Sequence, residues 1–247
     1  QDLLTAPSRW LADKTETEYR IEGEGIVVIP NFIDLQRFRP ADGTAKRREL
    51  GAEGRFLVTH VSNFRPVKRV KDVVSGFAAL RQRQDAVLAL VGSGPDLDDA
   101  LRLADVLGVR EHVRALGKLD DLETVLQASD VFFLPSVAES FGLAALEAQA
   151  CGCPVIGYRA GGLPEVVIDH ETGILCPEGE DVCLGSLAAD LLGDPERFRA
   201  MRQASRRNAE RFAMTPIVAS YEKALCCLVH ANRVCDAATM ADCAHTQ

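Results

Sequence analysis

Two carboxylates, Glu139 and Glu147, stand eight residues apart across a Ser-Phe-Gly turn and the start of an Ala/Leu-rich stretch. They follow the apolar run 131–134, which predicts a buried strand. A strand, a tight turn and a helix in this order leave free N–H groups and a positive dipole end at the helix start, which suits a phosphate. We expect Glu139 in the loop and Glu147 in the helix, both reaching one cleft, where sugar hydroxyls could bond a buried acid. The same residues also fit a core helix with one capping and one surface glutamate.

A basic loop follows another predicted strand. Arg65, Lys68 and Arg69 lie within five residues of one another. Arg65 can fork onto a phosphate with two hydrogen bonds, and Lys68 can add a point charge. Two adjacent phosphates carry more charge than N–H groups near Gly142 can neutralise, so cations from a facing loop are chemically apt. The alternative is a solvated basic turn.

Apolar runs alternate with amphipathic helical stretches through the middle of the chain. The predicted strands are 56–61, 87–91, 113–116, 131–134, 154–156 and 174–176. The predicted helices between them are 70–81, 97–107, 122–128, 142–150 and 163–168. Apolar strands separated by helices predict an α/β fold with a doubly wound parallel sheet of the Rossmann type. Ligands of such sheets bind at the carboxyl ends of the strands, where the glutamate and basic motifs both lie.

The chain is predicted to divide into three regions. Residues 1–42, with a helix over 5–20 that Ser8 could cap and a short strand over 26–29, are expected to be the end of a mostly missing N-terminal domain plus a linker. The polar stretch 39–54 indicates a linker. Residues 43–212 form the Rossmann-like domain and finish with helices over 181–192 and 195–212. Residues 213–247 form a helix over 217–229 and an irregular Cys-rich tail.

The composition excludes several classes of function. The chain has 247 residues and a formal charge of −8, which argues against nonspecific nucleic-acid binding. No apolar run approaches the roughly 20 residues of a membrane span, and no export signal is visible, so we expect a cytoplasmic protein with reduced cysteines. The first residue is Gln1 rather than Met, which indicates a fragment. The cysteines of the tail do not follow a zinc-finger spacing, and we expect no metal.

Glycine motifs follow two further strands. Gly92-Ser93-Gly94-Pro95 lacks the third glycine of a dinucleotide fingerprint, which favours a tight turn near the cleft over an NAD site. Gly161-Gly162 enters a helix and allows close backbone approach. Glu165 could cap that helix or face the cleft. His60 ends an apolar strand and is expected to be a core residue with satisfied hydrogen bonds.

With the basic loop, the glutamate pair and the Gly-Gly loop in this order, the chain resembles the nucleotide-binding C-terminal half of retaining glycosyltransferases. These enzymes have the GT-B architecture of two Rossmann domains, and the resemblance is to the large fourth family, over roughly residues 1–225. The family signature of a glutamate, seven residues and a second glutamate fits Glu139 to Glu147 without a gap. Many members carry Gly-Arg where this chain has Ser62-Asn63, so Arg65 could take the arginine role by a different path.

The resemblance implies a nucleotide-diphosphate sugar as donor, bound by 43–212, with no cofactor and no metal. Glu147 would hold the ribose and Glu139 would lie near the hydroxyls of the donor sugar. The implied catalytic residues are Glu139, Arg65 and Lys68. The implied donor-binding residues, besides Glu147, are Ser140, Phe141, Gly142, Leu143, Asn63, Arg69, Gly117 and Lys118.

The strings 29–34 and 60–70 look like those of the bacillithiol-pathway branch of the family, which joins N-acetylglucosamine to L-malate. The resemblance thus implies UDP-GlcNAc as donor and a small-molecule acceptor such as L-malate, with no nucleic acid and no membrane span. A homo-oligomer stays open. The alternatives are a nucleotide-sugar epimerase of the same architecture and a non-catalytic nucleotide-binding module. Because the N-terminal domain is missing, we expect the fragment alone to transfer no sugar.

Overall fold

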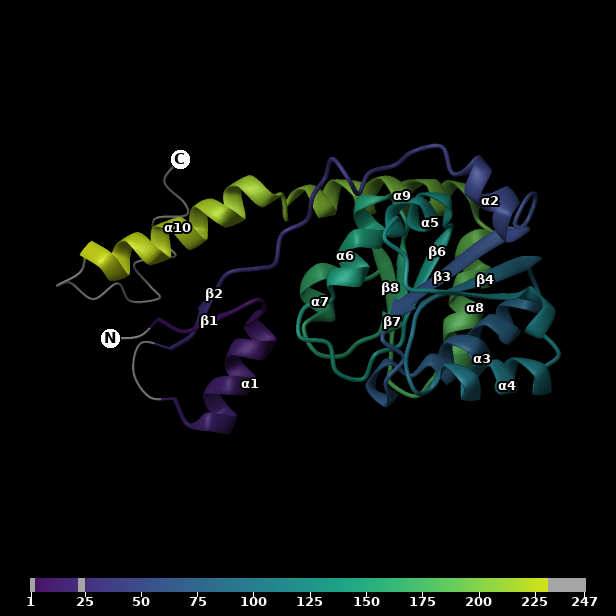
Figure 1. Cartoon of the computed structure of the whole chain (residues 1–247), viewed down its shortest axis with the longest axis horizontal. Helices are drawn as coiled ribbons and strands as arrows, with labels where there is room; N and C mark the ends of the chain where they lie inside the picture. Colours follow the sequence, from purple (N-terminus) through teal and green to yellow (C-terminus); the bar gives the residue numbers. More distant parts are fainter. Residues whose placement is uncertain (1–2, 22–24, 231–247) are drawn as a thin grey trace.

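A six-stranded parallel sheet forms the centre of the larger part of the molecule (Figure 1). The computed structural model describes residues 3–21 and 25–230. The strand order is β5-β4-β3-β6-β7-β8, and all neighbours pair in parallel. The strands are β3 (Phe56–Ser62), β4 (Ala86–Gly92), β5 (Val113–Gly117), β6 (Val131–Leu134), β7 (Val155–Tyr158) and β8 (Gly173–Cys176). All six predicted strands are present, and the predicted doubly wound α/β fold is confirmed.

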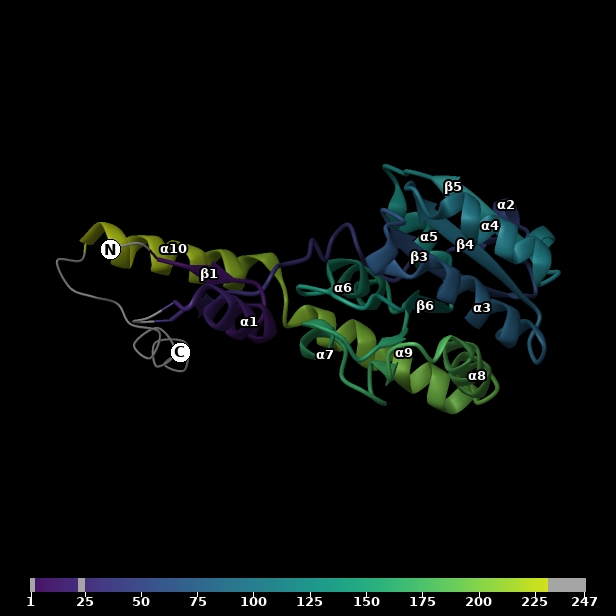
Figure 2. The same cartoon turned by 90° about the horizontal axis from the view of Figure 1, so that it is seen from below.

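Helices cover both faces of this sheet (Figures 1 and 2). One layer contains α3 (Val70–Arg81), α4 (Leu97–Val106) and α8 (Asp181–Leu192). The other contains α2 (Thr44–Leu50), α5 (Leu122–Ala128), α6 (Leu143–Ala150) and α9 (Pro195–Glu210). The short helix α7 (Leu163–Val166) packs beside α6.

The central strands β4 and β6 are apolar on both faces because both faces are buried. Leu88 and Leu90 of β4 belong to the core beneath α3 and α8, whereas the alternating Val87 and Ala89 belong to the core on the opposite face. All four side chains are fully buried. Each buried Leu or Val contributes about 1.5–3 kcal/mol, so this alternation fixes which residues face which layer.

The N-terminal segment and the last helix lie together at one end of the molecule, beside the six-stranded sheet (Figures 1 and 2). The segment consists of β1 (Thr5–Ala6), α1 (Arg9–Tyr19) and β2 (Val27–Val28), and the last helix is α10 (Met214–His230). The helix predicted over 5–20 starts only at Arg9, because β1 pairs with β2 in a small parallel sheet. Ser8 is the predicted cap: its Oγ accepts the N–H of Leu11 at 3.1 Å. The predicted tail from residue 232 lies outside the described residues.

The stretch 39–54, predicted as a linker, contains the helix α2, which the sequence did not indicate. Asp42 starts the helix by accepting both the N–H and the hydroxyl of Thr44, at 2.9 and 2.6 Å. Leu50 is buried, and Arg47 bonds the carboxylate of Asp130 at 3.0 Å. The helix is therefore stabilised by tertiary contacts that a polar composition conceals.

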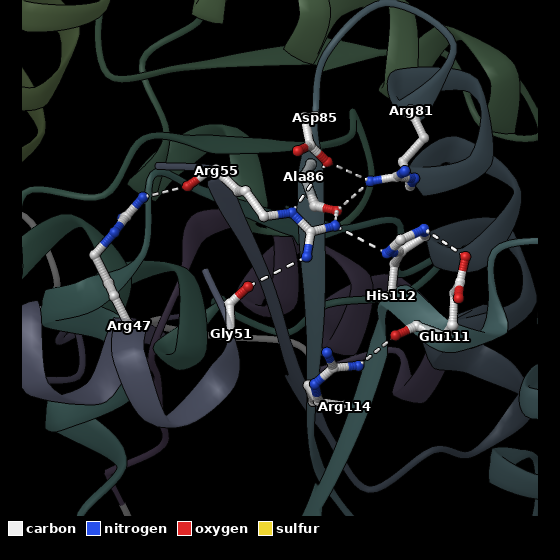
Figure 3. Close-up of polar contacts among 9 residues, drawn as sticks. All are labelled: Arg47, Gly51, Arg55, Arg81, Asp85, Ala86, Glu111, His112 and Arg114. Carbon is white, nitrogen blue, oxygen red and sulfur yellow. Dashed lines mark hydrogen bonds and ion pairs between the residues drawn. The ribbon is translucent and has the colours of Figure 1, made fainter. Parts of the chain in front are cut away.

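Arginine side chains tie together the amino-terminal ends of three strands (Figure 3). The Arg55 guanidinium, just before β3, donates to Asp85 at 3.0 Å and to the Nδ1 atom of His112 at 2.8 Å. Arg81 donates to the same carboxylate at 2.8 Å and to the carbonyl of Ala86, where β4 begins. Burial and the nearby arginines lower the pKa of His112, so its neutral ring can accept from Arg55. A shallow cavity of about 630 Å³ lies here, at the end of the sheet remote from the loops described next.

Candidate functional site

The order of the strands brings the loops after β3 and β6 together. The chain runs from β3 through β4 to β5 on one side, and from β6 through β7 to β8 on the other, so the order reverses between β3 and β6. Such a switch point leaves a crevice at the carboxyl ends of the strands, which is where ligands of open α/β sheets bind. The two loops are joined directly, since the N–H of Val137 donates to the carbonyl of Val67 at 3.0 Å.

Lys68 and Glu139 form an ion pair across this switch point. The Nζ atom of Lys68 donates to Oε2 of Glu139 at 2.7 Å. The two side chains are only 21% and 13% exposed, so the pair is shielded from solvent more than a surface pair would be. Lys68 ends a 3-10 turn that starts at Pro66, whose ring presets the turn. Two residues predicted from separate motifs thus form one charged unit.

The other two cations of the basic loop behave differently. The side chain of Arg65 is exposed and has no hydrogen bond or ion pair to any described residue, so its guanidinium is available to an anion. Arg69 is the residue before α3, and its Nε donates to Asp72 at 2.9 Å. Asp72 also accepts the hydroxyl of buried Tyr158 at 2.8 Å. The contact with Asp72 holds Arg69 at the start of α3.

The loop that carries Glu139 packs on the Gly-Gly loop after β7. The N–H of Gly162 donates to the carbonyl of Glu139 at 2.6 Å. A Cβ at Gly161 would lie 2.1 Å from that same carbonyl oxygen, so a side chain there is excluded. The close backbone approach predicted for these glycines is confirmed.

The N-terminal segment contacts the same loop. The Ser8 hydroxyl donates to the carbonyl of Ser140 at 2.5 Å. The Glu165 carboxylate accepts the N–H groups of Arg9 and Trp10, each at 2.8 Å, so it caps the start of α1. The sequence indicated Glu165 as a cap for its own helix or a cleft residue, and the observed cap is on a different helix. Nothing in the sequence pairs Ser8 with Ser140, because 132 residues separate them.

Helix α6 starts at this loop without a capping side chain. Gly142 precedes it with φ 102°, a left-handed conformation that glycine adopts readily. Phe141 is buried and packs edge-on against Phe212, with ring centroids 5.6 Å apart. Ser140 and Leu143 on either side are exposed. The first-turn N–H groups and the positive end of α6 are therefore open to an anion beside the Lys68–Glu139 pair.

Glu147 lies in α6, and Glu139 lies in the preceding loop, as predicted. Burial raises the pKa of Glu147 to about 7, and the charge of Arg37 opposes that rise. The carboxylate has no hydrogen bond or ion pair to any described residue. A partly buried, unpaired carboxylate is costly, and hydroxyl donors from a ligand would lower that cost.

The free energy of unfolding should depend on pH because of the Glu147 carboxylate. The pKa of Glu147 in the folded protein, about 7, lies above its ordinary value of 4.5, so the stability linked to this group is complete below pH 4.5 and is lost as pH rises through 7. Glu147→Gln should therefore be more stable than the unaltered chain at pH 8, by roughly 2–3 kcal/mol, and equally stable near pH 4.5. Urea unfolding at both pH values measures the difference. Glu222→Gln, at an exposed position of α10, is the control. An equal effect of Glu147→Gln at both pH values would contradict the expectation.

The loop after β5 contacts the linker through Arg37. Gly117 ends β5 with φ 67°, and Lys118 is exposed. Arg37 of the linker donates to the carbonyl of Asp120 and to Glu123, the latter at 2.9 Å. Sequence reasoning missed Arg37, because only the fold brings the linker next to this loop and near Glu147.

The Gly92–Gly94 turn packs on the backbone of the basic loop, as predicted for a tight turn near the cleft. The Asp96 N–H donates to the carbonyl of Phe64 at 3.0 Å. Asn63, the remaining predicted donor-binding residue of this loop, is exposed. Within residues 3–21 and 25–230, no three His, Cys, Asp or Glu side chains are grouped to hold a metal ion. Over the same ranges, none of the helices combines the length and apolarity needed to cross a membrane.

The chain is similar in sequence to known glycosyltransferases. Residues 42–208 match the family described as "Glycosyl transferases group 1". The N-acetyl-alpha-D-glucosaminyl L-malate synthase of Bacillus anthracis is 41% identical over 223 residues, which cover 90% of this chain and 58% of that protein. A D-inositol 3-phosphate glycosyltransferase of Segniliparus rotundus is 34% identical over 91% of this chain and 53% of its own length.

Solved structures agree with the sequence comparisons. Anabaena Alr3699/HepE, crystallised with UDP and glucose, superimposes with a TM-score of 0.84 and 25% identity. The match covers 90% of this chain and 62% of that one. The chain thus spans a little over half the length of the relatives that it matches. By its sequence match and its fold, the chain belongs to the group 1 glycosyltransferases of the GT-B architecture.

Proposed function

We propose that this chain is the donor-binding half of a retaining glycosyltransferase that transfers N-acetylglucosamine from UDP-GlcNAc to a hydroxyl of L-malate. The observation that carries the proposal is the Lys68–Glu139 pair beside the uncapped start of α6, at the switch point of the sheet. The names of two similar proteins support the finer assignment: one is a synthase of N-acetylglucosaminyl malate, and the other was crystallised with UDP and glucose.

Each part of the crevice has a proposed partner on the donor. The diphosphate lies against Arg65, Lys68 and the N–H groups after Gly142, with Asn63 and Ser140 at its rim. Glu147 accepts the two ribose hydroxyls, which suits its partly buried and unpaired carboxylate. The base lies along the loop at Gly117 and Lys118. Arg69 adds positive charge from its place at the start of α3.

The proposed catalytic effect is electrostatic stabilisation of the leaving group. Breaking the bond between the sugar and the phosphate places positive charge on the sugar and an extra negative charge on the UDP. Arg65, Lys68 and the α6 dipole lie where that negative charge grows, and they stabilise it without a metal ion. Glu139 faces the sugar side, where an anionic carboxylate stabilises developing positive charge and accepts sugar hydroxyls.

The remaining parts of the chain fit a two-domain enzyme. We infer that residues 1–42 are the end of an N-terminal domain and that 43–212 bind the donor; helix α10 lies beside the N-terminal segment (Figures 1 and 2). The acceptor would then bind mainly to the other domain, whose closure excludes water and aligns the acceptor. The buried free thiols of Cys151, Cys153 and Cys176 support a reducing compartment, the cytoplasm.

Calorimetry on this chain tests the donor site. We expect weak UDP binding. The affinity should fall as the salt concentration rises, because part of it comes from charge pairing, and it should not change when a chelator is added. Arg65→Ala should raise the Kd of UDP about tenfold but leave uridine binding unaltered. Glu147→Ala should weaken uridine and UDP by the same factor. Absence of UDP binding at millimolar concentration, with the fold intact by circular dichroism, would refute the proposed function. Loss of binding on adding the chelator would refute the metal-free clamp.

A further inference from the structure

We propose that His60 and Ser62 are positioning residues that hold the basic loop, 63–68, in the shape that receives the diphosphate of the donor. The inference rests on the proposed function. It assigns a role to a buried histidine and a serine that lie outside the charged groups of the site.

The hydrogen bonds of the His60 ring have a fixed direction. The ring is fully buried, with Nδ1 2.9 Å from the carbonyl oxygen of Phe133 and Nε2 2.8 Å from Oγ of Ser62. A carbonyl oxygen can only accept, so Nδ1 carries the proton and Nε2 of the neutral ring accepts the Ser62 hydroxyl. Burial, assisted by the charge of Lys68, lowers the pKa of His60 to about 4, which keeps the ring neutral in ordinary buffers.

Ser62 links the His60 ring to the backbone of the basic loop. Its hydroxyl hydrogen points to His60, so its oxygen is free to accept the N–H of Phe64, at 3.1 Å. The carbonyl of Phe64 accepts the N–H of Asp96 at 3.0 Å. Both backbone polar groups of Phe64 are therefore fixed, one through the serine and one through the turn after β4.

Phe64 needs this support because its backbone conformation is unfavourable. Its φ is 39°, in the left-handed region that costs a residue other than glycine about 1–2 kcal/mol. The conformation buries the Phe64 ring completely, 5.9 Å from the His60 ring, while Asn63 and Arg65 on either side are exposed. If Phe64 relaxed to an ordinary conformation, the backbone would turn Arg65 away from the crevice.

The His60 ring also takes the place of a backbone hydrogen bond between two strands of the sheet. The backbone ladder between β3 and β6 ends at the pair Thr59–Phe132. One residue further along, His60 bonds the Phe133 carbonyl with its side chain. The strand that leads to the Lys68 loop and the strand that leads to the Glu139 loop are thus joined at the point where they diverge. These two hydrogen bonds satisfy both ring nitrogens, as burial requires, and at the same time they link β3 to β6 and to Ser62.

The test is UDP and uridine affinity of Ser62 variants of this chain, measured by calorimetry. Ser62→Ala should raise the Kd of UDP three- to tenfold, because one hydrogen bond that shapes the diphosphate loop is lost. The Kd of uridine should change less than about twofold, since uridine carries no phosphate to contact the loop. Ser62→Thr keeps the hydroxyl and should retain the affinity for UDP.

The outcomes separate the inference from the proposed function. Unchanged UDP affinity of Ser62→Ala, or an equal loss for uridine and UDP, would overturn the positioning role. Failure of Ser62→Thr to retain UDP affinity would also overturn it. If the unaltered chain bound no UDP, the proposed function would fail and this inference with it. His60→Phe, which keeps an aromatic ring but removes both hydrogen bonds, should reproduce the selective loss of affinity for UDP.

Discussion

Glu139→Gln in the complete enzyme is expected to lower kcat by about two to three orders of magnitude, with little change in the KM of the sugar donor. Glutamine keeps the size of the side chain but removes the charge that faces Lys68 at 2.7 Å. The amide can still accept from sugar hydroxyls in the ground state, but it cannot stabilise positive charge on the sugar in the transition state. Lys68 loses its partner and pairs more strongly with the phosphates of bound donor, which offsets any loss of donor affinity.

The measurement is steady-state release of UDP with saturating acceptor, using the enzyme with both domains. Glu171→Gln, on the exposed turn between β7 and β8, is the matched control and should leave kcat unchanged. Lys68→Met and the double variant complete a cycle in which the two losses should be far from additive, because the residues act as a pair. A kcat within fivefold of normal for Glu139→Gln would show that Glu139 has no part in the chemistry.

Gly94→Ala is expected to destabilise the chain by more than about 3 kcal/mol, a loss reserved for severe packing or backbone conflicts. A Cβ at this position would lie 1.8 Å from the carbonyl oxygen of Asn63 and 2.7 Å from its carbon. Backbone atoms cannot rotate away as a side chain can. The two loops are also held together by the Asp96–Phe64 hydrogen bond, so separating them breaks a second contact.

Urea unfolding measures the loss, and Gly193→Ala serves as the control. At Gly193 the nearest atom to a new Cβ would be the Ala189 carbonyl oxygen at 3.1 Å, a contact that a small shift relieves. We expect that control to change stability by no more than about 1 kcal/mol. A loss of stability below about 1 kcal/mol for Gly94→Ala would mean that the loops after β3 and β4 can separate freely.

The fold was predictable because strand burial leaves a strong pattern. The predicted runs are mostly apolar, the central ones on both faces, and the observed strands are the same six. Helix α2 was missed because its stability comes from Arg47 and Leu50 contacts with other elements, and its seven residues carry no apolar periodicity. Local sequence indicates only the local preference for helix or strand, whereas this helix depends on contacts with residues far away in the sequence.

The site was predictable as a set of residue types but not as a set of contacts. The motifs predicted that Lys68 and Glu139 belong to one crevice, yet their pairing depends on β3 lying next to β6, across 71 residues of sequence. Arg65 and Arg69 look alike in the sequence, and only the position of Asp72 on the next helix separates an open cation from a paired one. The roles proposed for these residues stay predictions until the variants are measured.

The bridge between the linker and the end of α9 restricts how the two ends of the molecule can move. The chain passes twice between the six-stranded sheet and the end that carries β1, β2 and α10, and the two passages lie side by side at Ile33 and Ala213. The Ile33 N–H donates to the Phe212 carbonyl at 2.9 Å, and both side chains are buried. The same two ends are also joined by the hydrogen bond from Ser8 to Ser140 and by the Glu165 carboxylate at the start of α1, so the bridge is one of several links between them. Movement of the N-terminal end relative to the six-stranded sheet should therefore require the α1 contacts to break before the bridge at Ile33 can act as a pivot.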